Sequence, residues 1–221
     1  MTRFFDILFS LLATIVLLPF MIPIMIGLLL TGEHEVFYTQ ERIGRYGKPF
    51  KLLKFATMLK NSANMPGGLY TTEDDPRVLP MGKFLRKTKI NELPQLLNIL
   101  FGQMSVIGYR PTTKYFYDLY SDDVRTKIHD LRPGLSGIGS VVFRDQDNFL
   151  DKAEDKDKFY REVISPYKGE LEAWYSQNNN LITYFKLIFL TVVAVLKPKS
   201  RLWMKILPGL PKVPDGLKEM V

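Results

Sequence analysis

Residues 82–111 read GKFLRKTKINELPQLLNILFGQMSVIGYRP, and this stretch says most about how the chain folds. Asn91 stands where a helix N-cap is expected, because its side chain can accept a hydrogen bond from the first turn. Pro94 falls inside that first turn, where a missing N–H group does no harm. Gly102 is a typical residue just past a helix end. The pattern therefore predicts a helix from Asn91 to about residue 101, preceded by a short basic helix or turn.

The residues around that helix start also suggest a chemistry. Arg86, Lys87 and Lys89 precede it, and Glu92 lies in its first turn. The N–H groups at a helix N-terminus bind anions, so neighbouring cations favour a phosphate there. Glu92 could then attack a phosphoryl group, act as a base or hold Mg²⁺. The alternative is purely structural: Asn91 caps the helix, Glu92 complements its dipole, and the cations are solvated.

The composition describes one globular domain with a strong attraction to anions. The chain has 221 residues, of which 46% are hydrophobic and 24% charged, which is long enough for one domain and a short anchor. A net charge of +7 points to nucleic acid, acidic lipid or phosphorylated small molecules as partners. The basic residues form no recognisable nucleic-acid-binding signature, so we expect no nucleic acid partner.

The residue types exclude several kinds of site. Cysteine is absent, which excludes disulfides and thiolate metal sites. His34 and His129 are the only histidines, so a zinc site built from histidines is not expected. Carboxylate chemistry remains, with a hard metal bound through oxygen.

An apolar segment near the N-terminus predicts a membrane anchor. No charged residue lies between Asp6 and Glu33, and the 24 residues at positions 7–30 would span a hydrocarbon core of about 30 Å as a helix. Pro19 and Pro23 lie near the middle, where each removes a backbone donor and favours a kink. The segment is therefore either a kinked span or a re-entrant helix that breaks and returns to the same face.

The flanking residues orient this anchor. No small-x-small cleavage site follows it, which argues against a signal peptide. Basic residues on both sides suit a re-entrant segment, since Arg3 precedes the apolar run. A basic cluster follows it and is expected to stay in the cytoplasm. This cluster consists of Arg42, Arg45, Lys48, Lys51 and Lys54.

Two further patterns complete the expected fold. Residues 36–40 and 50–55 are rich in β-branched, aromatic and apolar residues around a Gly-Pro turn, which predicts a small β-hairpin. Leu181–Leu196 is a second apolar run, too short for a confident span, and is expected to be a core-facing or interfacial helix. We expect an α+β fold, mostly helical, with a re-entrant membrane helix-hairpin, a small β-hairpin, and a cytosolic catalytic core with interfacial amphipathic helices.

The expected organisation has three parts. Residues 1–32 form the anchor, residues 33–197 the cytosolic domain, and residues 198–221 a basic, proline-rich tail. The tail has the composition of a loose segment that lies on a membrane surface or faces a partner.

Residues 82–111 also resemble the core signature of the bacterial sugar transferases, the monotopic polyprenyl-phosphate phosphoglycosyl transferases. That signature is close to L-R-[KR]-[TS]-x-[ILV]-D-E-L-P-Q-L-x-N-V-x-x-G-x-M-S-[LI]-[VI]-G-P-R-P. The chain matches it at Leu85, Arg86, Lys87, Thr88, Glu92, Leu93, Pro94, Gln95, Leu96, Asn98, Gly102, Met104, Ser105, Gly108, Arg110 and Pro111. So many matches at fixed spacing are far more specific than a short motif.

The resemblance extends over roughly residues 1–197. The Arg3-x-x-Asp6 start and the proline-broken segment are similar to the family's re-entrant anchor. The Asp75-Pro76-Arg77 tripeptide and residues 131–137, LRPGLSG, resemble its later boxes. The tail has no counterpart.

The resemblance implies a reaction. Such enzymes transfer a phospho-sugar from a UDP-sugar to undecaprenyl phosphate, giving undecaprenyl-diphospho-sugar and UMP, as the first membrane step of glycan assembly. It implies a bacterial inner-membrane protein whose catalytic domain lies on the cytoplasmic face, in contact with lipid. A homodimer or a downstream glycosyltransferase would be a further partner. In the family an Asp-Glu dyad works with Mg²⁺, and the Asp forms a covalent phospho-sugar intermediate.

The implied site follows residue by residue. Glu92 and Asn91 take the catalytic and metal-binding positions, and Pro19 and Pro23 shape the anchor. The positions expected to bind phosphate or substrate are Lys54, Arg77, Arg86, Lys87, Gln95, Arg110 and Arg132.

One departure bears on the chemistry. Asn91 replaces the family's nucleophilic Asp, and a neutral amide oxygen is a poor nucleophile and a weaker Mg²⁺ ligand. Three explanations remain. Glu92 takes over as nucleophile; the lipid phosphate attacks the UDP-sugar directly, with Glu92 and Mg²⁺ assisting; or the protein is a lapsed enzyme that acts as a membrane scaffold for lipid phosphate or a partner glycosyltransferase.

Overall fold

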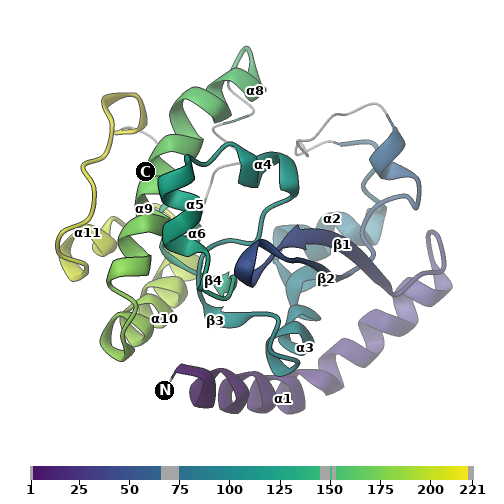
Figure 1. Ribbon diagram of the computed structural model, residues 1–221. Helices are drawn as coiled ribbons and strands as arrows, with labels where there is room; N and C mark the ends of the chain where they lie inside the picture. The colour runs from purple at the N-terminus through teal and green to yellow at the C-terminus, as the bar shows by residue number, and fades with distance from the viewer. Residues whose placement is uncertain (1, 66–74, 145–149, 151–152, 219–221) are drawn as a thin grey trace.

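The computed structural model describes residues 2–65, 75–144, 150 and 153–218, and shows an α+β, mostly helical protein with one small hairpin, as the sequence predicts (Figure 1). A long N-terminal helix lies along one side of the domain. The elements are α1 (Thr2–Leu30), β1 (Phe37–Ile43), η1 (Arg45–Gly47), β2 (Pro49–Phe55), η2 (Ser62–Asn64), α2 (Pro80–Lys87), η3 (Ile90–Glu92), α3 (Gln95–Leu100), β3 (Ser105–Ile107), α4 (Lys114–Asp118), α5 (Asp122–Ile128), β4 (Gly134–Ser136), α6 (Ile138–Val142), α8 (Lys156–Phe159), η4 (Tyr160–Ile164), α9 (Ser165–Gln177), α10 (Leu181–Leu196), α11 (Leu202–Ile206) and η5 (Asp215–Leu217).

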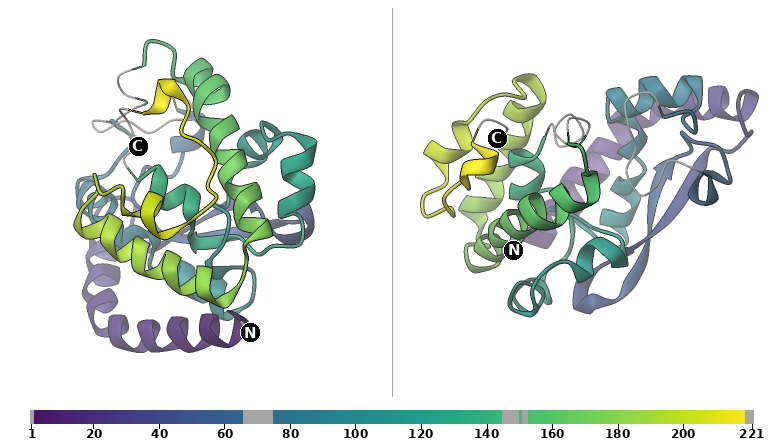
Figure 2. Two further views of the ribbon diagram at one scale, coloured as in Figure 1. Left: turned by 90° about the vertical axis from the view of Figure 1, so that its left-hand side faces the viewer. Right: turned by 90° about the horizontal axis from the view of Figure 1, so that it is seen from above.

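Helix α1 is continuous but bent. Its 29 residues include Pro19 and Pro23, each of which removes one intrahelical hydrogen bond. The left view of Figure 2 shows the two halves of the helix running in clearly different directions. By length and composition alone, α1 is long and apolar enough to cross a bilayer.

The first turn of α1 is fixed to the domain by polar contacts. The guanidinium of Arg3 donates to Ile99 O at 2.6 Å and to Leu100 O at 2.9 Å, which caps the carbonyl end of α3. Asp6 is buried, and its Oδ1 atom accepts hydrogen bonds from Ser105 Oγ, Val106 N and Tyr184 OH at 2.8 to 2.9 Å. The Arg and the Asp of the N-terminal sequence are therefore structural residues.

The last turns of α1 pack on the same domain. Met21 and Leu28 form a buried cluster with Phe55 of β2 and Leu85 of α2. A Cβ atom on Gly27 would lie 2.8 Å from Met81 Cε, so this glycine allows α1 to approach α2 closely. Both ends of the apolar helix are thus held by one folded body.

The hairpin has the predicted position and gains a support that the sequence does not reveal. Strands β1 and β2 pair antiparallel, from Phe37 opposite Phe55 to Ile43 opposite Pro49. The free edge of β2 is closed by Asn98 of α3, which accepts from Leu53 N at 2.9 Å and donates to Lys51 O at 2.9 Å. This signature asparagine therefore replaces a missing neighbouring strand.

The helix predicted to start at Asn91 starts four residues later, so Asn91 is not a helix cap. Lys89 has a φ of 60°, which interrupts the helical path after α2. Glu92 N then donates to Lys89 O and Leu93 N to Ile90 O, the i to i+3 pattern of a 3₁₀ turn. Helix α3 begins only at Gln95. Its end agrees with the prediction, since Gly102 has a φ of 81°.

Strands β3 and β4 form a short parallel pair that leads to the site. Gly108 N donates to Ser136 O at 2.9 Å, and Gly134 N donates to Tyr109 O at 2.8 Å. A Cβ atom at Gly108 would lie 2.3 Å from Arg132 O, so only glycine permits this approach. The chain leaves this pair at Arg110.

The largest hydrophobic core lies among α6, α9 and α10 and includes the C-terminal tail. Trp203, Leu207 and Leu217 are almost fully buried in it. Tyr167 OH also donates to Pro211 O at 3.2 Å. The expectation of a loose tail is therefore wrong, because its apolar residues complete the core.

Helix α10 has the predicted bounds and two different faces. Asn180 caps it by accepting from Thr183 N at 3.0 Å. Tyr184, Leu187 and Leu190 face the core and are buried. Large apolar residues on the opposite face are exposed, namely Ile182, Phe185, Phe189, Val192, Val195 and Leu196.

Candidate functional site

Glu92 lies at the centre of a group of polar residues from several elements. It belongs to the 3₁₀ turn η3, and its side chain keeps 18% of its surface exposed. Arg110 Nη2, beyond β3, lies 3.7 Å from Glu92 Oε1. The buried Gln95 side chain, at the start of α3, hydrogen-bonds to the same carboxyl group.

The charges around Glu92 keep it ionised. Burial raises the pKa of this carboxyl group, but the cations of Lys54, Arg110 and Lys89 and the Gln95 hydrogen bond outweigh that effect. The resulting pKa is about 2. Glu92 is therefore a carboxylate throughout the physiological range, and a weak base.

The hairpin supplies two more cations. Because Arg42 pairs with Phe50 and Tyr38 with Lys54, the side chains of Arg42 and Lys54 lie on the same face of the hairpin. Burial lowers the pKa of Lys54 to about 8, with Glu92 acting in the opposite direction and Arg42, Arg110 and Arg86 adding to the lowering. Burial and the neighbouring Arg110 lower the pKa of Arg42 to about 10. Several cations thus surround one carboxylate, an arrangement that favours a multiply charged anion.

Asn91, the residue before Glu92 in the 3₁₀ turn, has a buried side-chain oxygen. Its side chain is 6% exposed, and within the described residues Oδ1 has no hydrogen-bond partner. A buried polar atom without a partner is unfavourable unless a ligand satisfies it. Among the described residues, no three His, Asp or Glu side chains gather to hold a metal. Mg²⁺ commonly uses one or two protein carboxylates with phosphate oxygens and water, so the oxygens of Asn91 and Glu92 fit such an ion.

The structure brings five of the predicted residues together with Asn91. They are Lys54, Arg86, Glu92, Gln95 and Arg110, since each acts on the charge of Glu92 or of Lys54. Lys87 lies on the exposed side of the last turn of α2.

Arg77 and Arg132 have structural partners elsewhere. Arg77 is 5% exposed and pairs side-on with the buried Asp75, with Nε–Oδ1 at 2.9 Å and Nη2–Oδ2 at 2.6 Å. Arg132 donates to Gly102 O at 2.9 Å, and its charge interacts with those of Arg45 and Arg3. For these two residues phosphate binding remains a prediction from the resemblance.

Two residues of the site, Arg42 and Glu172, are not predicted from the sequence. Arg42 stands in the sequence only as one of several cations after the anchor, although the strand register puts its side chain on the same face of the hairpin as Lys54. Glu172 of α9 is fully buried and accepts a hydrogen bond from Arg110 N at 3.3 Å. The one available signal for Glu172 was an acidic residue within a helix whose neighbours Leu171 and Ala173 are apolar.

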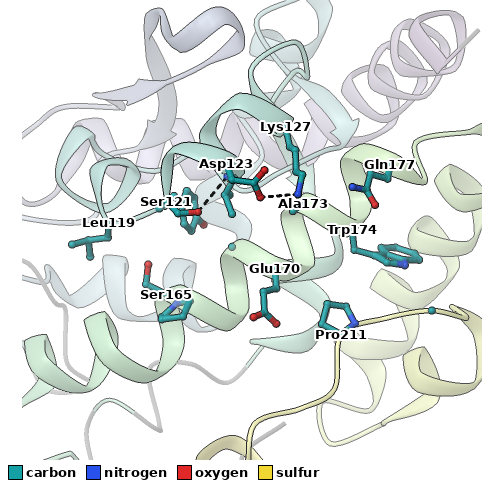
Figure 3. Close-up of a pocket in the computed structure, with 15 residues that line it drawn as sticks. Leu119, Ser121, Asp123, Lys127, Ser165, Glu170, Ala173, Trp174, Gln177 and Pro211 are labelled. Carbon is teal, nitrogen blue, oxygen red and sulfur yellow. Dashed lines mark hydrogen bonds and ion pairs between the residues drawn. The ribbon is translucent and has the colours of Figure 1, made fainter.

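A separate hollow lies on another side of the domain (Figure 3). It has a volume of about 670 Å³ and is bounded by α5, α9 and the C-terminal tail. Trp174, Glu170 and the Asp123–Lys127 ion pair lie around it. None of the residues predicted for the site lines this hollow.

Comparison with known proteins places this arrangement in a family. The model of the bacterial sugar transferase family matches residues 1–198. The exopolysaccharide production protein ExoY of Sinorhizobium fredii is 30% identical over 207 residues, which cover 87% of this chain and 84% of that protein. A putative undecaprenyl-phosphate N-acetylgalactosaminyl 1-phosphate transferase of Bacillus subtilis is 41% identical over 122 residues, 55% of this chain and 68% of that protein.

Longer relatives contain the match as one part. The UDP-glucose:undecaprenyl-phosphate glucose-1-phosphate transferase of Klebsiella pneumoniae is 32% identical over 195 residues. These cover 86% of this chain but only 39% of the Klebsiella protein.

Proposed function

Because the chain belongs to the bacterial sugar transferase family, we propose that it is a phosphoglycosyl transferase that moves a sugar-1-phosphate from a UDP-sugar to undecaprenyl phosphate. In this reaction the bond between the bridging oxygen and the β-phosphorus of the UDP-sugar breaks, and UMP leaves. A new P–O bond joins the β-phosphorus to the lipid phosphate. The products are undecaprenyl-diphospho-sugar and UMP.

The observation that carries this proposal is the ring of cations around one ionised carboxylate. Lys54, Arg110 and Arg42 come from the hairpin and from the end of β3, and they converge where Glu92 is held. Phosphoryl transfer needs little covalent help from a protein beyond positioning and charge neutralisation. The site offers both, because the cations can bind the diphosphate and Gln95 fixes the carboxylate.

Mg²⁺ would be held here by the Glu92 carboxylate and by Asn91 Oδ1, and it would supply additional neutralisation of the diphosphate. The cations already present reduce what the metal must contribute. They also favour its arrival together with the diphosphate, since a free dication is repelled by a site rich in positive charge.

Two routes are open because Asn91 stands in the nucleophile position. In the covalent route, a Glu92 oxygen attacks the β-phosphorus and UMP leaves; an oxygen of the lipid phosphate then displaces Glu92. In the direct route, the lipid phosphate oxygen attacks the β-phosphorus, and Glu92 stays ionised beside it. Its pKa of about 2 is compatible with both routes but excludes a role as an effective general base at neutral pH.

The test is UMP release by the full chain in membranes or nanodiscs, with Mg²⁺, undecaprenyl phosphate and a panel of UDP-sugars. We expect release with at least one sugar, and a loss of about 100-fold or more in Glu92→Gln. Glu170→Gln is the matched control, because it removes an exposed carboxylate from α9. If the wild type released no UMP with any of the UDP-sugars, the proposal would be wrong.

Asn91→Asp separates the two routes. A gain in turnover argues for a covalent route that Asn91 slows. A phospho-sugar adduct on the wild type, detected by mass spectrometry when lipid is omitted, supports the route through Glu92, whereas an adduct on Asn91→Asp alone shows only that the new carboxylate can react. Loss of turnover in both Asn91→Asp and Glu92→Gln shows that the Asn-Glu pair works by its own mechanism. The alternative function, a lapsed enzyme that binds lipid phosphate as a scaffold, predicts that binding survives Glu92→Gln and that no variant releases UMP.

The attachment of α1 supports a re-entrant anchor on the cytoplasmic face of the bacterial inner membrane. Arg3 and Asp6 at one end and Leu28 at the other contact the same domain, which a straight span would not permit. The bend near the middle of the helix and the exposed apolar faces of α1 and α10 suit partial insertion into one leaflet. A site beside this surface can receive a lipid phosphate in the plane of the membrane.

A further inference from the structure

Glu172 is a buried acid that the reaction described above does not use. It lies in the middle of α9 with no exposed surface, and its Oε1 atom accepts a hydrogen bond from Arg110 N at 3.3 Å. Its second oxygen, Oε2, has no partner among the described residues. Burying an acid in this way is unfavourable, so its contact with Arg110 calls for an explanation.

The fold makes room for this contact. A Cβ atom on Gly139 of α6 would lie 2.5 Å from Glu172 Oε1, so a larger residue at position 139 would displace the carboxyl group. Gly137, which follows β4, likewise allows the backbone of Gly108 to approach closely. A Cβ atom on Gly137 would lie 2.0 Å from Gly108 O. Gly139 thus leaves room for the Glu172 carboxyl group, and Gly137 leaves room for the backbone two residues before Arg110.

The contact comes at the point where the strand pairing ends. Up to Tyr109 the backbone is held by β4, through Gly108 N to Ser136 O and Gly134 N to Tyr109 O. Arg110 N donates to no backbone oxygen in the described residues, and the Glu172 carboxyl group replaces that acceptor. The next support of the backbone is Thr112 O, which accepts from Ile43 N. Glu172 therefore fixes the residue whose guanidinium lies 3.7 Å from Glu92.

The geometry points to Glu172 as a positioning residue that holds the Arg110 backbone so that the Arg110 side chain meets Glu92 and the transferring phosphate. This inference rests on the proposed function of the Glu92 site. Burial raises the pKa of Glu172 to about 7, against the Arg110 hydrogen bond and the charges of Lys168 and Arg110. A carbonyl-type oxygen remains available to Arg110 N in both protonation states, so the hydrogen bond does not require the charge.

Two variants of Glu172 separate its role as a hydrogen-bond acceptor from its charge. Glu172→Met fills a similar space without an acceptor, whereas Glu172→Gln keeps an acceptor and removes the charge. We expect the kcat of UMP release to fall about 100-fold in Glu172→Met, with the KM for the UDP-sugar within about threefold, because a small misplacement of a transition-state group acts on kcat. Glu172→Gln should keep at least a third of the wild-type kcat, and Glu170→Gln should match the wild type. Thermal unfolding of each variant shows the fraction folded.

A double-mutant cycle with Arg110→Met completes the test. If Glu172 acts through Arg110, Glu172→Met adds no further loss in the Arg110→Met background. Independent, multiplied losses in the double variant would overturn the inference, as would a Glu172→Met enzyme within twofold of wild type. Should Glu172→Met not fold, Glu172→Gln decides, and less than a tenth of wild-type turnover contradicts the role. A wild type that releases no UMP overturns the proposed function instead.

Discussion

Among the cations around Glu92, Lys54 has the charge most sensitive to pH. Its pKa is about 8, lowered chiefly by burial, whereas Glu92 has a pKa of about 2 and Arg42 one of about 10. Between about pH 3 and 7 these three groups stay charged, so none of them changes the charge of the site in that range. Above about pH 8, Lys54 loses its proton, and the site loses one of the charges that would neutralise a diphosphate.

Turnover should therefore fall as the pH rises through about 8. Lys54→Arg moves this alkaline limb to higher pH, because a guanidinium holds its proton more strongly than an ammonium group. The measurement is the pH profile of kcat/KM for UMP release by both enzymes between pH 6 and 10. Lys158→Arg, an exposed position on α8, serves as the control and should leave the profile unchanged. An alkaline limb of equal position in wild type and Lys54→Arg would contradict this role of Lys54.

At the scale of elements, the first turn of α1 depends on one carboxylate. Asp6→Ala removes the acceptor of Ser105 Oγ, Val106 N and Tyr184 OH and leaves these donors unsatisfied. We expect a loss of about 3 kcal/mol, or roughly 6–12 °C in Tm. Tyr184→Phe removes one of the three bonds and should cost about 1 kcal/mol. Thermal unfolding in detergent measures both, and equal Tm values for the two variants would show that Asp6 is not the common acceptor.

The two ends of α1 should be reached from the same side of the membrane. The chain has no cysteine, so Thr2→Cys and Glu33→Cys each introduce a single thiol. A membrane-impermeant maleimide should label both thiols in inside-out vesicles and neither in intact cells. Asp130→Cys, an exposed position in the domain, is the control and should show the same labelling pattern. Labelling of one end from intact cells would show that α1 spans the bilayer.

The elements show which sequence signals are sufficient and which are not. Helix α10 was predicted to the residue because its Asn cap and apolar length act locally. The start of α3 was missed because Lys89 adopts a left-handed conformation that no local preference of lysine indicates. Because this interruption is not visible in the sequence, Asn91 looked like a helix cap, whereas its side chain is buried within the turn η3.

At the scale of the whole molecule, the C-terminal tail belongs to the core. Truncation after Lys197 removes Trp203, Leu207 and Leu217, which are buried in the largest cluster. Each such residue contributes about 1.5–3 kcal/mol, so their loss approaches the total stability of an ordinary domain. We expect little folded protein by size-exclusion chromatography, although the family match ends at residue 198. Truncation after Lys218 is the control and should elute like the full chain.

The candidate site combines residues of one local signature with residues from distant parts of the chain, and among the distant ones that reach it the sequence indicated Lys54 but not Arg42 or Glu172. The signature around Glu92 gave Arg86, Gln95 and Arg110 directly. Arg42 and Glu172 are brought to it by strand register and by the packing of α9, which depend on the complete fold. Arg77 pairs with its buried neighbour Asp75, a contact that the sequence does not reveal, and its phosphate binding remains a prediction.

The contact between Asp6 and Tyr184 has a consequence for the folding of the chain during its synthesis on the ribosome. The two residues are 178 positions apart, so the carboxylate leaves the ribosome long before its last hydrogen-bond donor. At 5–20 residues per second, the interval is roughly 10–40 seconds. Ser105 and Val106 emerge earlier, so during the last part of that interval Asp6 lacks only its third donor. The C-terminal part of the chain thus completes the attachment of the first turn of α1. A product whose synthesis stops before Tyr184 lacks this hydrogen bond to Asp6.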